Sequence, residues 1–386
     1  MHATKSSSAA QSCNGDILLD LFLYLSEGDL AHAALVCRAW SAPARMTLYS
    51  TISFDNSSSQ ATQLACTLHA RPELRELIRH LIYISHPGNS EPPDWLALLP
   101  EGTLRTLNWG SDIFIVSPAD ILRSPAVRTV SKLVLHIEPS SKTEDIWSAI
   151  QDMMYSPSLH SLSVGPYITE RVSFPSGLKH FSVFTYTYTE QVKRLVTDPD
   201  TQLERFDAYI GQRDVRALMQ DLRRSQTRLK HLTFITGVNH WQYIPLMEES
   251  LHSFPLLETL VCSSAVCLPD LLLHLPLTVR SLTILARAFA RQRCLNFTQA
   301  VRDRLADAER GPCRRRLPES ITIVEVCKRS WQLARPITQD LAHDLQRMDE
   351  LADVCMAAGI HLDWVGIKDE EYNYLLPYSF YRAYLV

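Results

Sequence analysis

Residues 16–52, DILLDLFLYLSEGDLAHAALVCRAWSAPARMTLYSTI, decide how the N-terminal part of the chain folds. Three short amphipathic segments, 16–25, 29–39 and 41–50, follow one another within this stretch. In the first segment Ile17, Leu18, Leu21, Phe22 and Leu25 recur at helical spacing and make a broad apolar face. We therefore predict a helix there.

The second segment repeats this pattern, and Asp29 precedes its apolar run. Its apolar residues are Leu30, Ala33, Ala34, Val36, Cys37 and Trp40. Asp29 is predicted to be the N-cap, because its carboxylate can accept a hydrogen bond from an unpaired backbone N–H at a helix start. Helices of about ten residues are too small to bury a core of their own. We expect another protein to complete their apolar faces.

The stretch resembles an F-box. The matching residues are Asp16, Ile17, Leu18, Leu21, Phe22, Leu25, Asp29, Leu30, Val36, Cys37, Arg38, Trp40, Leu48, Tyr49 and Ile52. The Val-Cys-Arg-x-Trp core lies at the family's distance after the Asp-Leu pair. The family's opening Leu-Pro is absent, and Cys13 and Asn14 stand in its place. The alternative is an ordinary helical hairpin that caps the next domain.

The resemblance implies a role in ubiquitin ligation. F-box proteins bind the Skp adaptor and, through it, a cullin, and their second domain presents a protein substrate. The residues implied to bind the adaptor are Ile17, Leu18, Leu21, Phe22, Leu25, Leu30, Val36, Cys37, Trp40, Leu48 and Tyr49. No catalytic step, metal or cofactor is implied. The expected compartment is the cytoplasm or the nucleus.

Beyond residue 55 a short unit recurs, made of an apolar residue, two variable ones, a second apolar residue, one variable and a third apolar residue. The copies begin at Leu104, Val130, Leu159, Leu178, Leu203, Leu229, Leu257 and Val279, with weaker ones at Ile78 and Ile321. From Leu107 to Leu282 the central residues lie 26, 29, 19, 25, 26, 28 and 22 positions apart. This spacing is typical of leucine-rich repeats, which contribute one strand each.

We therefore predict an α/β fold in which the helical module precedes an irregular leucine-rich-repeat solenoid. Segments 144–155, 214–223 and 241–252 have helical periodicity and are expected on the outer side. A doubly wound α/β domain also alternates strands and helices. Its Gly-x-Gly-x-x-Gly turn is absent from the sequence.

The predicted domains are a disordered N-terminus at 1–13, the module at 14–54, the solenoid at 55–330 and a C-terminal cap at 331–386. Within the cap we expect a helix over 337–358 that ends at Gly359, followed by a short apolar run. The final segment is rich in tyrosine, and it either packs on the cap or offers a recognition surface. An arginine-rich stretch, 287–316, is interpreted as a solvated helix face, and the alternative is a site that binds phosphates or a nuclear import receptor.

Composition excludes several function classes. The net charge is −4, which disfavours nucleic acid as a partner. The apolar runs are too short for a membrane helix, so a soluble intracellular protein is expected. Nine scattered cysteines fit a reducing compartment. Cys262 and Cys267 lack a second pair, so we expect core burial rather than zinc, and we find no nucleophile or phosphate-binding motif.

The variable positions of the predicted strands should be exposed together on the concave face of the solenoid. We expect a protein substrate to bind there. The candidate residues are Asn108, His136, Ser163, Phe184, Asp207, Tyr209, His231 and Thr233. Two alternatives to a ligase subunit stay open: a non-ligase F-box scaffold with a degenerate adaptor site, and an enzyme whose site the sequence does not reveal.

Overall fold

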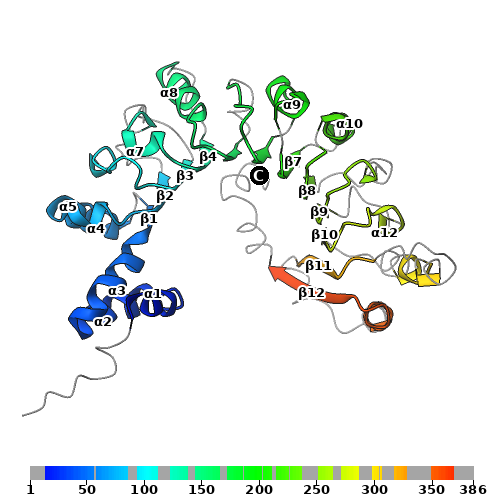
Figure 1. Ribbon diagram of the computed structural model, residues 1–386, viewed down its shortest axis with the longest axis horizontal. Helices are drawn as coiled ribbons and strands as arrows, with labels where there is room; N and C mark the ends of the chain where they lie inside the picture. Colours follow the sequence, from blue (N-terminus) through cyan, green and yellow to red (C-terminus); the bar gives the residue numbers. More distant parts are fainter. Residues whose placement is uncertain are drawn as a thin grey trace, which may run out of the picture. The chain divides into compact units, whose positions relative to one another are not determined.

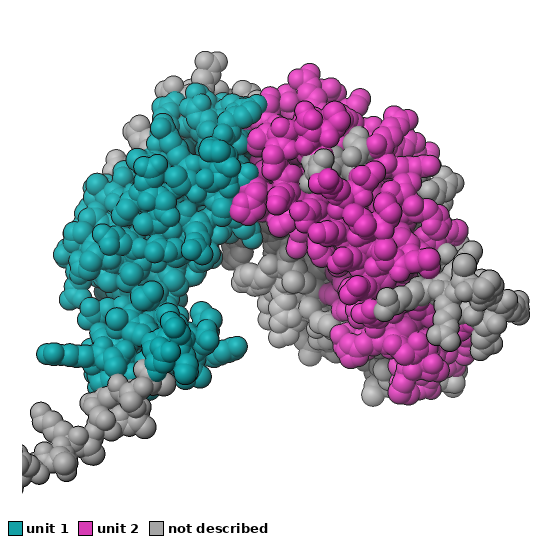
Figure 2. Space-filling view, in the orientation of Figure 1, with its two compact units in different colours: residues 1–159 teal, residues 160–386 magenta. Residues whose placement is uncertain are grey.

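The computed structural model describes residues 14–55, 58–85, 94–111, 122–137, 144–165, 172–185, 187–201, 203–210, 214–225, 227–236, 251–263, 271–286, 298–303, 305–306, 317–327 and 349–368. The chain forms two compact units, Met1–Leu159 and His160–Val386, which Figure 2 colours separately. Each unit is described by itself. Residues 1–13, expected to be disordered, lie outside the described residues.

The first unit opens with the three predicted helices, α1 (Gly15–Phe22), α2 (Glu27–Val36) and α3 (Arg38–Ser50). Asn14 caps α1, since its Oδ1 accepts from the N–H of Asp16 at 3.2 Å. The cap therefore defines the helix start without the missing Leu-Pro. The prediction of Asp29 as the N-cap of α2 is wrong.

Ser26 caps α2 instead. Its Oγ accepts from the N–H of Asp29 at 3.2 Å and donates to Asp29 Oδ2 at 2.6 Å. The helix starts three residues earlier than predicted because serine and the acid three positions later form a reciprocal cap. Asp29 still lies in the first turn, where a negative charge stabilises a helix.

Twelve strands follow in the described part of the chain, and all the recorded pairings between them are parallel. They are β1 (Thr51–Asp55), β2 (His80–Ser85), β3 (Thr106–Ser111), β4 (Lys132–Ile137), β5 (Ser161–Val164), β6 (His180–Phe184), β7 (Arg205–Ile210), β8 (His231–Thr236), β9 (Thr259–Ser263), β10 (Ser281–Ala286), β11 (Ser320–Cys327) and β12 (His361–Lys368). The strand order is the chain order. Because the order never reverses among the described strands, they lack the topological switch of a doubly wound sheet.

Every predicted copy of the repeated unit forms a strand. In β8, for example, Leu232 and Phe234 are buried and alternate with His231 and Thr233. The leading residue of this copy, Leu229, is also buried. Equivalent positions of neighbouring copies lie in register, so that Phe181, Phe206 and Leu232 pair in turn. The strands β1 and β12 were not predicted.

The helices after the module lie on one side of the strands in each unit (Figure 1). In the first unit these are α4 (Ser59–Ala70), α5 (Pro72–Arg75), η2 (Asp94–Leu96), α7 (Pro125–Arg128) and α8 (Glu144–Met154). In the second they are α9 (Glu190–Thr197), α10 (Val215–Ser225) and α12 (Leu271–His274). The helices α8 and α10 confirm two of the three helical predictions. Most of the third, 241–252, lies outside the described residues.

The core fills the space between these helices and the strands. In the second unit Phe181, Phe206 and Phe234 from adjacent strands form an aromatic ladder with ring centroids 6.0 and 6.3 Å apart. Leu218 and Leu222 of α10 are fully buried. Offset aromatic pairs of this kind add about 0.5–1.5 kcal/mol beyond the area they bury.

Near the C-terminus, residues 349–357 are helical and Gly359 ends the helix, as predicted. Its φ of 72° suits glycine, because a side chain would be strained there. The apolar run that follows becomes β12, which pairs along its whole length with β11. Most of 287–316 and all of the tyrosine-rich segment 369–386 lie outside the described residues.

Candidate protein-interaction surfaces

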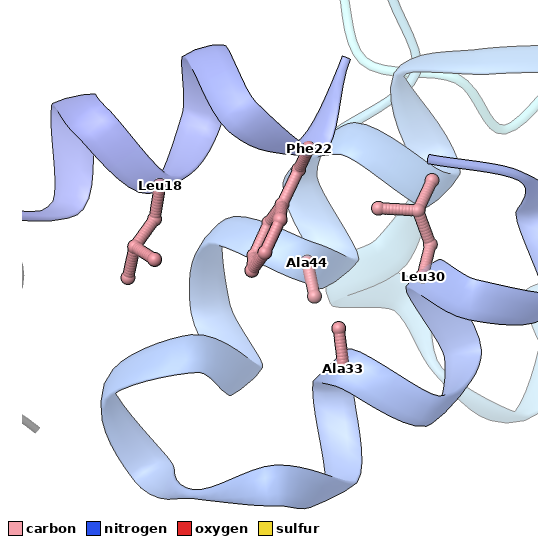
Figure 3. Close-up of a cluster of buried hydrophobic side chains, with 5 residues drawn as sticks. All are labelled: Leu18, Phe22, Leu30, Ala33 and Ala44. Carbon is pink, nitrogen blue, oxygen red and sulfur yellow. The ribbon is translucent and has the colours of Figure 1, made fainter. Parts of the chain in front are cut away.

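The helical module has a small core of its own. Leu18 and Phe22 from α1, Leu30 and Ala33 from α2, and Ala44 from α3 are buried together (Figure 3). Trp40 meets Phe22 edge to face at a centroid distance of 5.5 Å. Five side chains, two of them alanine, make a thin core for a domain.

The predicted adaptor-binding residues therefore divide into two groups. Buried or partly buried within the module are Leu18, Phe22, Leu30, Cys37, Trp40, Leu48 and Tyr49. Exposed on its surface are Ile17, Leu21, Leu25 and Val36. Among the predicted residues, the second group offers the most apolar surface to a partner without a change in the module's own packing.

The exposed group centres on one side of α1. Ile17 and Leu21 are one helical turn apart on α1, which ends at Phe22, and Leu25 follows in the bend after the helix. Tyr24, which sequence reasoning missed, lies in the turn after α1, three residues after Leu21, and is 89% exposed. Its helical spacing from Leu21 was the available signal. We call Ile17, Leu21, Tyr24 and Leu25 the docking stripe.

Leu35 and Val36 at the end of α2 and Met46 on α3 add exposed apolar surface to the module. Scattered apolar residues are normal on protein surfaces, but a continuous stripe marks an interaction site. The neighbouring Asp16 and Asp20 are exposed and place acidic groups beside the stripe. The module thus presents an apolar strip with an acidic border.

The predicted substrate-binding residues lie on the face of the strands opposite the helices, which we call the second face. In the first unit Asn108 is half-buried on β3. His136 belongs to β4, but its side chain lies outside the described part of the chain. In the second unit Ser163, His231 and Tyr209 are half-buried.

The expectation that these positions are all exposed is wrong for Phe184, Asp207 and Thr233, which are buried. Their neighbours on the same face explain part of the burial. Phe184 stacks on Tyr209 with centroids 4.1 Å apart. Burial raises the pKa of the Tyr209 hydroxyl, so it keeps its proton at neutral pH.

Asp207 is a buried acidic residue on the second face. Its Oδ2 accepts hydrogen bonds from Ser182 Oγ at 2.9 Å and from Arg205 Nε at 2.8 Å. The hydrogen bond from Arg205 raises the pKa of that guanidinium. Asp207 is only 6% exposed, and its Oδ1 has no recorded hydrogen-bond partner in the structure. A buried acceptor without a donor costs about 1–3 kcal/mol.

The N-terminal edge of the same strands carries His160, His180, Arg205 and His231 in neighbouring positions. The His160 and His180 rings have centroids 6.4 Å apart. Burial and then the charge of His160 lower the pKa of His180. Nearby, Lys230 Nζ donates to Glu204 Oε2 at 3.1 Å, which lowers the pKa of that carboxyl.

Cys262 is fully buried on β9, as its inward position predicts, and Cys267 lies outside the described residues. Within the described ranges, no three His, Cys, Asp or Glu side chains are grouped as a metal site requires. None of the helices in those ranges is long and apolar enough to cross a membrane.

Comparison with known protein families identifies residues 16–55 as an F-box-like domain. The match covers the three helices and β1, and so includes the docking stripe. F-box-like domains are protein-interaction modules that generally bind Skp-type adaptors. The match supports the F-box resemblance and does not extend to the strands after β1. No curated protein matches the chain.

Proposed function

We propose that this protein is a non-catalytic substrate-recognition subunit of a Skp–cullin–F-box ubiquitin ligase. The observation that carries the proposal is the exposed docking stripe on the F-box-like domain. Such a subunit binds the adaptor with one part and a protein substrate with the other. It raises the effective concentration of a substrate lysine near the ubiquitin-charged enzyme. Its work would then lie in the cytoplasm or the nucleus.

We further propose that the strands form an irregular leucine-rich-repeat solenoid. Each strand buries the second and third apolar residues of its unit, as Leu232 and Phe234 do in β8. Parallel pairing in chain order supports stacking of neighbouring units. In such a fold the second face is the one free of helices, which makes it our candidate for the substrate.

Affinity purification of the tagged chain followed by mass spectrometry tests the ligase assignment. We expect a Skp-type adaptor and a cullin to co-purify with the wild-type chain. The Leu21→Asp variant should lose both. Leu277→Asp is the matched control, because Leu277 has the same 55% exposure as Leu21 but lies in the second unit. Retention of adaptor and cullin by Leu21→Asp at the wild-type level would refute the proposal.

A non-ligase scaffold is the second candidate, and one observation favours it. Asn14 occupies the start of α1 where the F-box pattern has Leu-Pro, which removes an apolar leucine and a proline from that end of the docking stripe. The same purification separates the two functions. A scaffold brings down the adaptor without the cullin.

A further inference from the structure

An apolar row, interrupted at Ser263 of β9, crosses the second face of the second unit beside polar residues such as Asp207 and Thr233. The row consists of Phe184, Tyr209, Ile235, Leu285 and Val324. Strand register places Phe184 beside Tyr209 and Tyr209 beside Ile235, and it places Leu285 beside Val324. These residues belong to β6, β7, β8, β10 and β11.

Four members of this apolar row are buried and Tyr209 is half-buried, although all of them lie on the face away from the helices. Ile235, Leu285 and Val324 form a cluster separate from the main core, with Tyr209 and Val261 packed against it. On β8, Ile235 alternates with the core residues Leu232 and Phe234, so it belongs to the second face. Neighbouring side chains on this face account for part of the burial, and a segment lying over the row would account for the rest.

Asp207 lies beside the apolar row, and its carboxylate needs a hydrogen-bond donor. It stands two residues before Tyr209 on β7, so both side chains lie on the second face. Its Oδ1 is a buried acceptor that lacks a recorded donor. A ligand that fits this surface must therefore bring apolar bulk for the row and a hydrogen-bond donor for the carboxylate. The tyrosine side chain combines the two, a large ring and an O–H.

We propose that the apolar row and Asp207 bind the chain's own C-terminal segment, residues 369–386. That segment contains six aromatic residues in 18, five of them tyrosine, together with Leu375, Leu376 and Leu385. It follows directly on β12. The chemistry of the segment thus matches both requirements of the surface.

Chain geometry allows the contact. The last residue of β12, Lys368, lies three positions beyond Val365, which pairs with Val324 of the row. The segment begins at residue 369, four positions beyond Val365 and one strand away from Val324, and so within about 14 Å of the row's end at about 3.3 Å per residue and about 4.8 Å per strand spacing. Five strand spacings separate β12 from β7, about 24 Å. An extended segment of this length reaches about 60 Å.

A C-terminal segment bound there would occupy the same face that we propose for the substrate, and the two would compete. Hydrogen–deuterium exchange of the full chain alone tests the contact. It needs neither adaptor nor ligase, so its outcome is independent of the adaptor-binding experiment. We expect the amides of 369–386 to exchange at least about tenfold more slowly than in a synthetic peptide of the same sequence.

Two sets of variants identify the site. Ile235→Thr combined with Leu285→Thr should return the segment to the exchange rate of the free peptide, whereas Ile82→Thr, on the second face of β2, should leave it slow. Serine at all five tyrosines of the segment should have the same effect as the double variant while leaving the strands untouched. A wild-type segment that exchanges like the free peptide overturns the proposal. So does a segment that stays protected in the serine variant.

Discussion

Replacing Leu21 by aspartate should abolish adaptor binding while the module stays folded. Full burial of a leucine side chain is worth about 1.5–3 kcal/mol, and Leu21 is 55% exposed, so binding gains about 1 kcal/mol from covering it. The new carboxylate would be buried without a partner, which costs several kcal/mol more. A loss of about 3 kcal/mol or more weakens binding by over about 100-fold.

Titration calorimetry with purified Skp-type adaptor measures this loss, and thermal unfolding followed by circular dichroism shows that the module is intact. Leu277→Asp, at the same exposure, should change neither quantity. Leu18→Asp provides the opposite contrast, because Leu18 is 1% exposed and a carboxylate there should unfold the module. The reasoning fails if Leu21→Asp binds within about threefold of wild type.

Three further outcomes are expected. Phe22→Ala should lower the free energy of unfolding of the module by about 3–5 kcal/mol, measured by chemical denaturation, because it empties the core beside Trp40. Ser26→Ala should cost about 0.5–2 kcal/mol through the lost cap of α2, seen as a lower melting temperature. The pKa of His180 is lowered in the folded state, so the unfolded state binds more protons. The free energy of unfolding should therefore fall as the pH drops below about 6.5. His180→Asn should reduce this loss of stability, measured by denaturation at a series of pH values.

The strands were predictable because each copy of the unit places apolar residues at alternate positions. Leu232 and Phe234 are buried for that reason, and the same spacing recurs in every copy. β1 was not predicted, although its buried residues Ile52 and Phe54 alternate with exposed ones in the same way. It follows α3 directly, without the leading apolar residue and turn that introduce the other strands.

The docking stripe shows where sequence reasoning stops. Ile17 and Leu21 form one pair at helical spacing, and Leu18 and Phe22 form another one residue further round the helix. Periodicity predicts the helix but treats the two pairs alike. Packing against α2 and α3 decides that Leu18 and Phe22 turn inward and that the other pair stays exposed. A substitution of Phe22 would therefore test folding rather than adaptor binding.

Sequence spacing also fails to predict which residues of the second face are buried. Alternation predicts that Asp207 and Thr233 point away from the core, and they do. It does not predict their burial, because that depends on contacts between strands and on what covers the face. The hydrogen bond from Ser182 to Asp207 and the stacking of Phe184 on Tyr209 join β6 to β7 and need a particular register, which only the folded sheet provides.

The joint between the module and the sheet bears directly on the proposed function. α3 ends at Ser50 and β1 starts at Thr51, so no linker separates them. The carbonyl of Ser50 also accepts a hydrogen bond from the N–H of Arg79, the residue before β2, at 2.9 Å. The module is thus held to the first two strands by the chain and by a hydrogen bond between the last residue of α3 and the residue before β2. A ligase that works by proximity benefits from such a stiff connection, because a flexible linker would spread the substrate over a larger volume and lower its effective concentration.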